Sequence, residues 1–348
     1  MQEPEKKKQK KAKVTMKDVA LAAGVSQSTV SFVLNGQEDM RIGKETRDRV
    51  LKAAETLDYR YRSAGRPPSR SRPTTYGFMI DEIATSPFAS ISIEAFQEQA
   101  WSDGALVEIA MTGGDPGYEQ QVLQKWQRDG IDGVVYASIL TREVSPHLAL
   151  RKHRAVLLNC HDKEGLFRAV VPAERRGGHA ATMALIGEGY RRIAFIAGEA
   201  WMEASEQRQE GFIRAMHESG LEPEPELIRQ GNFMPSGGYR ETRELLSLDA
   251  PPEAIFCAND LTALGCYEAL KEHGVHVGAD IAVVGYDDQE IAQHLSPALS
   301  TVLLPHGEMG RWCARQLRAK STLLPRVERM ACPFVARQSH LRAPLTTD

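Results

Sequence analysis

The sequence has no long apolar segment. No apolar run approaches the roughly 18 residues that a membrane-spanning helix needs. The N-terminal stretch "MQEPEKKKQKKAK" carries lysines but lacks the apolar region of a secretion signal. We therefore expect a cytoplasmic protein.

Cysteine is scarce and is not arranged for metal binding. The chain has five cysteines, and none forms a CxxC pair. Their odd number and wide spacing favour reduced core residues over a set of disulfides or a zinc site. No metal and no cofactor is expected. The five positions are Cys160, Cys257, Cys266, Cys313 and Cys332.

Catalytic motifs are also missing. The segment "TGGDPGYE" is rich in glycine, but it lacks the Lys-Ser/Thr pair with which a P-loop holds phosphates. The sequence contains no GxSxG and no HExxH motif. An enzyme is therefore not expected, and a binding function is favoured.

The charge is distributed unevenly along the chain. At 348 residues and 42% hydrophobic content, we expect two or three domains. Residues 1–75 hold 17 Lys and Arg against 9 Asp and Glu, a net charge of +8, so the overall charge of -3 leaves -11 for the rest. Residues 1–13 are expected to form a disordered basic tail, and the lysine run alone indicates no more than that. The surplus that follows it favours a polyanionic partner.

Residues 14–58 are predicted to form a helix-turn-helix. Thr15 and Asp18 have the spacing of a capping box, and Gly24 ends the first helix. Ser26 is a natural N-cap for a second helix, which Asn35-Gly36 would stop after about ten residues. A third helix runs from about Lys44 to Leu57. Three short helices with a tight glycine turn are typical of this motif.

The start of the second helix carries small polar residues. A recognition helix needs such side chains near its N-terminus, where they reach base edges in the major groove, and Gln27 and Ser28 stand there. A three-helix bundle that serves only as an interaction module is the alternative, and the basic surplus argues against it. The predicted DNA-contacting residues of this domain are Thr15, Ser26, Gln27, Ser28, Thr29, Ser31, Phe32 and Asn35.

Two segments of this domain carry a family resemblance. "VTMKDVALAAGVSQSTVSFVLNG" and "TRDRVLKAAETLDYR" closely resemble the DNA-binding headpiece of the lactose-repressor/galactose-repressor (LacI/GalR) family. Phe32 stands where many members have a basic or polar residue, which leaves the operator sequence open. Gly43 replaces the usual serine cap of the third helix, a substitution that costs little because glycine is an acceptable cap.

The rest of the chain predicts an α/β core. Seven short apolar runs alternate with amphipathic segments, which indicates parallel sheets covered by helices. The runs are "TYGFMI", "LVEIAM", "GVVYA", "AVLLN", "RIAFIAG", "AIFCAND" and "IAVVGYDD". The resemblance implies a periplasmic-binding-protein-like core at 75–340, in which three crossing segments join two parallel-sheet subdomains. It places the first subdomain at about 75–160 and 290–320, and the second at about 161–289 and 321–340.

Polar residues stand where several of these runs end. Ligands of open α/β sheets collect at the carboxyl ends of strands, so such residues are candidates for an effector site. Two of them have simpler interpretations: Asp260 is predicted to cap the helix that follows it, and Asp288 suits a turn. The full set of polar groups after the runs is Asp81, Asn159, Asn259, Asp260, Asp287 and Asp288.

The resemblance assigns effector-binding roles residue by residue. "QRQEGF" places Arg208 as the ligand-binding arginine, and "QGNFMPSGGY" places Phe233 as the aromatic that stacks on a ligand ring. It also assigns Asn259 and Asp287, and more loosely Asp81 and Asn159. Carboxylate, amide and guanidinium groups pair with adjacent hydroxyls and an aromatic stacks on a ring face, so the set suits a sugar. For any one of these residues a surface or core role is the alternative.

The predicted function is a sequence-specific transcription regulator, a repressor in the first place, whose operator affinity changes when a sugar binds the core. "DEIATSPFA", "TGGD" and "LPHGEMG" resemble a branch that responds to glucosides, so a disaccharide glucoside is the expected effector. At least a dimer is expected, because one recognition helix reads too few base pairs and two can span a palindromic operator. A secreted sugar-binding protein would have no use for a helix-turn-helix. A regulator with a vestigial cleft and a protein co-effector remains the alternative.

The linker at residues 59–74 contains "YRYRSAGRPPSRSRP". The family's linker forms a hinge helix that wedges a leucine into the minor groove, and matching the segments places Pro68 at that leucine. Pro67 disfavours helical angles at the residue before it, so we expect disorder in the free protein. Our hypothesis is that Pro68 acts as the wedge on DNA, with Arg62 and Arg66 as its anchors. A flexible charged tether is the alternative.

Overall fold

The structure is a computed structural model of the 348-residue chain. It describes residues 15–34, 42–57, 73–81, 87–319 and 326–342. The chain divides into two compact units, Met1–Arg72 and Pro73–Asp348. Within the described ranges, no helix combines the length and the apolar character that a membrane crossing requires.

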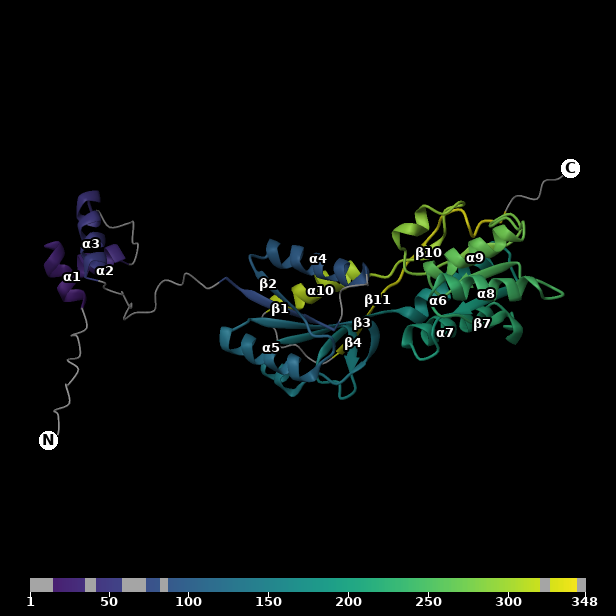
Figure 1. Cartoon of the computed structure of the whole chain (residues 1–348), viewed down its shortest axis with the longest axis horizontal. Helices are drawn as coiled ribbons and strands as arrows, with labels where there is room; N and C mark the ends of the chain where they lie inside the picture. The colour runs from purple at the N-terminus through teal and green to yellow at the C-terminus, as the bar shows by residue number, and fades with distance from the viewer. Residues whose placement is uncertain (1–14, 35–41, 58–72, 82–86, 320–325, 343–348) are drawn as a thin grey trace, which may run out of the picture. The chain divides into compact units, whose positions relative to one another are not determined.

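The first unit confirms the predicted helix-turn-helix fold. Its helices are α1 (Met16–Ala23), α2 (Gln27–Leu34) and α3 (Lys44–Thr56) (Figure 1). Gly24 ends α1 in the left-handed conformation, with φ of 64°, which glycine adopts without steric cost. Val19, Val30 and Val50, one from each helix, are fully buried and form the centre of a small core.

The helix starts of this unit follow the sequence expectations. The Asp18 carboxylate accepts hydrogen bonds from the backbone N–H and the hydroxyl of Thr15, at 2.7 Å each. The Ser26 hydroxyl accepts from the backbone N–H of Thr29 at 3.1 Å, so Ser26 caps α2 as predicted. Gly43 is the N-cap of α3 and supplies no side-chain bond.

The second unit contains a six-stranded parallel sheet in the order β11-β5-β4-β3-β1-β2. Helices α4 and α10 pack together over one face, and α5 covers the other (Figure 1). The bounds are β1 (Thr75–Ile80), α4 (Pro87–Ser102), β2 (Leu106–Met111), α5 (Pro116–Asp129), β3 (Gly133–Val144), β4 (Ala155–Asp162), β5 (Arg168–Pro172), α10 (His306–Arg318) and β11 (Arg326–Met330).

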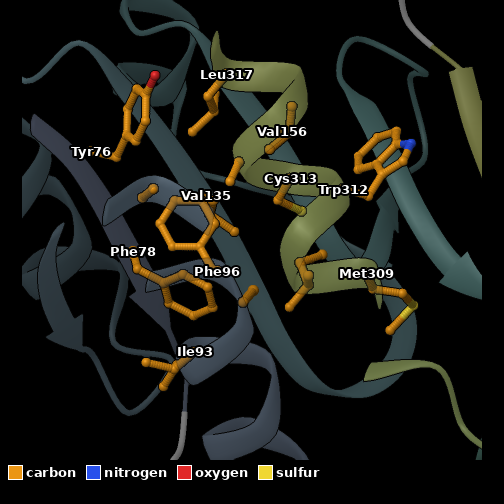
Figure 2. Packing of buried hydrophobic residues seen from close by; sticks show 14 of the residues in the cluster. Tyr76, Phe78, Ile93, Phe96, Val135, Val156, Met309, Trp312, Cys313 and Leu317 are labelled. Carbon is orange, nitrogen blue, oxygen red and sulfur yellow. The ribbon is translucent and has the colours of Figure 1, made fainter. Parts of the chain in front are cut away.

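Each face of this sheet has its own apolar core. On the α4 and α10 face, Phe78 of β1 packs edge-on against Phe96 at 5.3 Å between ring centroids, with Cys313 of α10 close by (Figure 2). On the α5 face, Trp126 lies against Gly77, where a Cβ atom would meet the indole at 2.6 Å. Only glycine fits beneath that indole, so Gly77 fixes how closely α5 approaches the sheet.

A second parallel sheet has the order β7-β6-β8-β9. One core cluster packs it against α6 and α7, and another against α8 and α9. A short antiparallel pair, β10 with β12, lies beside it. The bounds are α6 (Glu174–Gly187), β6 (Ile193–Ala197), α7 (Glu203–Glu218), β7 (Ile228–Gln230), α8 (Pro235–Leu246), β8 (Ala254–Cys257), α9 (Asp260–Glu272), β9 (Ala282–Val284), β10 (Thr301–Val302) and β12 (Phe334–Val335), with short 3₁₀ turns at Leu148–Lys152, Pro225–Leu227 and Glu290–Gln293.

This architecture confirms the predicted fold class, and the strand order moves the crossings from their expected positions. The first sheet continues through β4 and β5 to Pro172, rather than ending near residue 160. Residues 290–304 stay with the second sheet, and α10 begins the return at His306. Strand β11, expected in the second subdomain, pairs in parallel with β5 of the first. All five cysteines are buried and free, as expected for core residues.

Candidate functional site

The first unit presents polar side chains at the start of α2. Gln27 and Ser28 are exposed there, as a recognition helix requires. Ser26 and Thr29 are held by the cap, with their hydroxyls 2.8 Å apart. Thr15 is exposed, whereas Ser31 and Phe32 are half-buried. The other predicted DNA contacts, Asn35, Arg62, Arg66 and Pro68, lie outside the described residues.

The second unit holds a cavity of about 280 Å³ between its two sheets. Both subdomains contribute to its walls, and five of the six predicted effector-binding residues line it. They are Asn159, Arg208, Phe233, Asn259 and Asp287. Residues that lie 49 to 128 positions from Asn159 in the sequence therefore meet in one place. The strand-end pattern predicts Asn159, Asn259 and Asp287 among them, and the resemblance predicts Arg208 and Phe233.

Arg208 of α7 is the centre of a buried charge cluster. Its Nε and Nη2 atoms donate to the two carboxylate oxygens of Glu174, at 2.9 and 3.1 Å. Its Nη1 atom donates to the carbonyl of Ala258 at 2.6 Å. The guanidinium lies over the ring of Tyr286, 3.8 Å from its centroid. Such a fork-to-fork pair fixes the plane and direction of the arginine before any ligand arrives.

Asp287 lies beside this pair and has unused hydrogen-bonding capacity. Its Oδ1 atom is 3.2 Å from Nη1 of Arg208, yet no donor in the described part of the chain meets hydrogen-bond geometry at that oxygen. Burial raises the pKa of Asp287 to about 7, although Arg208 acts to lower it. A φ of 109° is also costly for any residue but glycine. A strained, buried carboxylate with a vacant acceptor is suited to a ligand hydroxyl.

Phe233 and Asn259 form one positioned unit. The Nδ2 atom of Asn259 donates to the carbonyl of Phe233 at 3.0 Å, which helps to hold Phe233 at its left-handed φ of 57°. The Phe233 ring lies against Gly198, where a Cβ atom would meet it at 2.0 Å. Gly198, directly after β6, therefore leaves the space that the Phe233 ring occupies in the cavity wall.

The prediction that Asp260 caps α9 is wrong. The N-cap is Asn259, whose Oδ1 atom accepts from the backbone N–H of Thr262 at 2.8 Å. Asp260 is fully buried and accepts instead from the Thr301 hydroxyl at 2.6 Å and the backbone N–H of Gln289 at 2.7 Å. Burial, aided by the charge of Asp287, raises the pKa of Asp260 to about 8. Asp260 thus links the start of α9 to the loop after β9 and to Thr301 of β10.

On the side of the first subdomain, Asn159 lines the cavity with its hydrogen bonds already made. Its Oδ1 atom accepts from the Thr141 hydroxyl at 2.7 Å, and its Nδ2 atom donates to the carbonyl of Ser138 at 3.0 Å. Asp81 is not among the residues that line the cavity. It accepts from the Ser138 hydroxyl, at 2.8 Å, and from Arg142, also at 2.8 Å, in the irregular part of β3.

Four polar residues that line the cavity lie outside the sets that the strand-end pattern and the resemblance predict: Thr141, Glu174, Gln289 and His306. Glu174 opens α6 directly after β5, and the short run "RAVVP" that forms β5 was not recognised as a strand. His306 opens α10, inside the "LPHGEMG" segment that was noted only for its family resemblance. A search for polar residues just after every short apolar run, however brief, would have found Glu174.

Comparison with known proteins agrees with this arrangement. The family model for bacterial regulatory proteins of the lacI family matches residues 15–61, and the model for a periplasmic binding protein-like domain matches residues 182–340. The ribose operon repressor of Haemophilus influenzae is 30% identical over 321 residues, which cover 90% of this chain and 92% of the relative. The transcriptional repressor PurR of Actinobacillus pleuropneumoniae is 31% identical over 315 residues, covering 90% and 91%. The solved structure of the transcriptional regulator CelR in complex with cellobiose is 28% identical, with a TM-score of 0.63, and the match covers 94% of this chain and all of that one.

Proposed function

This chain belongs to the lacI family of bacterial regulatory proteins, and from that premise we propose that it controls transcription in response to a neutral sugar, a disaccharide glucoside in the first place. It is a DNA-binding transcriptional repressor of that family, and its relatives are regulators rather than enzymes. Both statements confirm the sequence-based predictions. The sugar, its binding residues and the effect of the sugar on DNA binding are the proposal.

The charge balance of the cavity carries the proposal. Among the described residues that line it, Arg208 is the one permanent cation, and two carboxyl groups, Glu174 and Asp287, face it. An anionic ligand would therefore find no uncompensated positive charge, and burying its charge there would be costly. Hydroxyl groups, by contrast, can donate to Asp287 Oδ1 while an apolar ring face packs on Phe233.

The glucoside assignment rests on a relative as well as on the sequence segments. CelR, whose structure contains cellobiose, shares 28% identity with this chain over nearly its whole length. We assign Arg208, Asn259 and Asp287 to the sugar hydroxyls, Phe233 to a ring face, and Asn159 to the opposite wall. A regulator with a vestigial cleft is not favoured, because a collapsed site would not need a buried charge cluster with a vacant acceptor.

We propose that the repressor acts as a dimer on a palindromic operator in the cytoplasm, where the chromosome lies. Strand β2 is an edge strand of the first sheet and exposes Leu106, Ile109 and Met111. An unpaired edge with large apolar side chains favours association with another surface, and a second copy of the chain supplies the twofold symmetry that a palindrome needs. Of the predicted DNA contacts, Gln27 and Ser28 are the ones we expect to read bases.

One experiment on DNA tests the headpiece. An operator is selected from random DNA with the wild-type protein, and its affinity is measured for the double variant Gln27→Ala, Ser28→Ala. We expect a loss of about 1–3 kcal/mol on the operator and little change on random DNA, because phosphate contacts are kept. Equal losses on both DNAs would remove these residues from base recognition. Release of the wild-type repressor by cellobiose would support the sugar assignment.

A further inference from the structure

A further cavity is lined by arginines and lies apart from the sugar cavity. Its volume is about 650 Å³, within the range of about 300–1,000 Å³ that is usual for small-molecule sites. Helices α6 and α7 of the second subdomain and strand β11 of the first sheet supply its walls. No described residue lines both this cavity and the 280 Å³ cavity. We call it the arginine cavity, after Arg175, Arg176, Arg214 and Arg329.

Two of the four arginines are paired with carboxylates. Arg175 donates to the carboxylate of Glu210 on α7. Arg214 donates from Nε to Oε1 of Glu218 at 2.6 Å, and Oε2 of Glu218 lies 2.8 Å from Nε2 of His179. Both oxygens of Glu218 therefore have a partner, and the two carboxylates offset the charges of two arginines.

The other two arginines, Arg176 and Arg329, are not compensated. Both side chains are exposed, and neither has a hydrogen-bond, ion-pair or ring partner within the described residues. Four arginines against two carboxylates leave a surplus of two positive charges, with His179 counted as neutral. The surrounding chain is acidic, because residues 76–348 carry a net charge of -11. Two uncompensated positive charges in one cavity repel each other, and a bound anion relieves that repulsion.

We propose that the arginine cavity binds a phosphorylated small molecule. A phosphoryl group carries about -1.5 to -2 charges at neutral pH and three acceptor oxygens, so one such group matches the surplus. Guanidinium groups bind phosphate through paired N–H donors, which makes arginine the side chain best suited to this ligand. The sugar cavity has the opposite balance, since its one arginine faces two carboxyl groups. The inference goes beyond the proposed function and does not depend on the sugar assignment.

Calorimetry of the full-length repressor tests the site, with pyrophosphate as the probe at constant ionic strength and near-neutral pH. We expect saturable binding to the wild type. Arg176→Gln and Arg329→Gln should each weaken it about tenfold, because each removes a charged donor from the cavity. Arg128→Gln is the matched control: it removes an exposed arginine of α5 that lies outside the cavity, and it should leave pyrophosphate affinity within about twofold of wild type.

Two further measurements separate a binding site from a structural role and from charge alone. Neither cavity substitution should lower the melting temperature of the ligand-free protein, since neither arginine has a partner to lose. Citrate, a tricarboxylate of similar charge, should bind at least about tenfold more weakly than pyrophosphate, because it lacks the phosphoryl geometry.

Four results would overturn the proposal: no saturable heat with pyrophosphate, wild-type affinity in both cavity variants, an equal loss in Arg128→Gln, or citrate binding as tight as that of pyrophosphate. Cellobiose binding should be unchanged in Arg176→Gln, because no described residue lines both cavities. A failure of the sugar assignment would therefore leave the pyrophosphate result standing, and the two failures are distinguishable.

Discussion

The two subdomains contribute unlike surfaces to the same cavity. The second subdomain supplies a buried charge cluster, in which Arg208 is paired with Glu174 and Asp287, together with the Phe233 ring. The first subdomain supplies an apolar wall, the hydrogen bond between Thr141 and Asn159, and the buried imidazole of His306. One surface is organised to hold a polar ligand, and the other to close over it.

This difference indicates how a bound sugar could change the relation between the subdomains. A ligand that contacts both the charge cluster and the opposite wall would favour a closed arrangement of the two subdomains. One side-chain contact that crosses the cleft joins Nε2 of His161 on β4 to a carboxylate oxygen of Glu203 on α7, at 3.1 Å. Such a ligand shifts the equilibrium only as far as it binds the closed form more tightly than the open form.

The largest effect is expected for Arg208→Ala, which removes the centre of the charge cluster in the second subdomain. The substitution leaves two buried carboxyl groups without their cation, so we expect a loss of about 3–5 kcal/mol in the stability of the core and no effector response. Arg214→Ala, an exposed arginine on the same helix, is the control and should cost about 1 kcal/mol or less. Chemical denaturation gives the stability, and operator binding with and without sugar gives the response. An Arg208→Ala protein that still responds at the wild-type sugar concentration would contradict this assignment.

A smaller effect is expected when pH changes the stability of the core. The responsible carboxyl groups lie in the second subdomain. The pKa of Asp260 is raised from an ordinary 3.8 to about 8, and that of Asp287 to about 7. A carboxyl with a higher pKa in the folded state binds its proton more tightly there, so stability falls as pH rises from about 4 to about 8. Asp260→Asn should remove about 2–5 kcal/mol of that loss, measured by urea unfolding at pH 5 and pH 8. Parallel pH profiles for variant and wild type would show that Asp260 does not titrate in this window.

The smallest effect is expected at the His161–Glu203 contact across the cleft. His161 and Glu203 are each about one quarter exposed, and their side chains lie 3.1 Å apart. Glu203→Gln keeps the shape and removes the charge, so sugar affinity should change by less than about threefold, in line with a partly solvated pair worth under 1 kcal/mol. Calorimetry of the variant checks this value. A tenfold loss would mean that this contact contributes strongly to sugar binding, which would contradict the assignment of the binding groups to the second subdomain.

Sequence patterns predicted the fold well because the central strands are apolar on both faces. All seven predicted runs are strands of the two parallel sheets. Most of the missed strands lack that signal: β11, "RVERM", lies at a sheet edge with mostly polar residues, and β10 and β12 are two residues long. Strand β5, "RAVVP", is apolar but short. The chain crosses between the subdomains next to these short strands. The predicted subdomain boundaries therefore differ from the observed ones.

The site was predicted in part, and the limits have physical causes. The strand-end rule located Asn159, Asn259 and Asp287, whereas Arg208 and Phe233 came from the resemblance. Neither pattern shows which groups pair inside the cavity: the partner of Arg208 is Glu174, 34 residues earlier and on another helix. The choice between Asn259 and Asp260 as the cap of α9 could not be read from two adjacent residues that both favour N-caps.

Calorimetric titration of the full-length repressor is the most direct test of whether the cavity binds a neutral sugar. The titrants are cellobiose and a matched anionic derivative, cellobiouronic acid, in which a carboxylate replaces one CH2OH group and both rings are kept. Both are applied to the wild type and to Asp287→Asn. We expect saturable heat with cellobiose, at least about tenfold weaker binding in the variant, and little or no heat with the acid. Binding of the acid as tight as that of cellobiose, or no heat from cellobiose in the wild type, would contradict it.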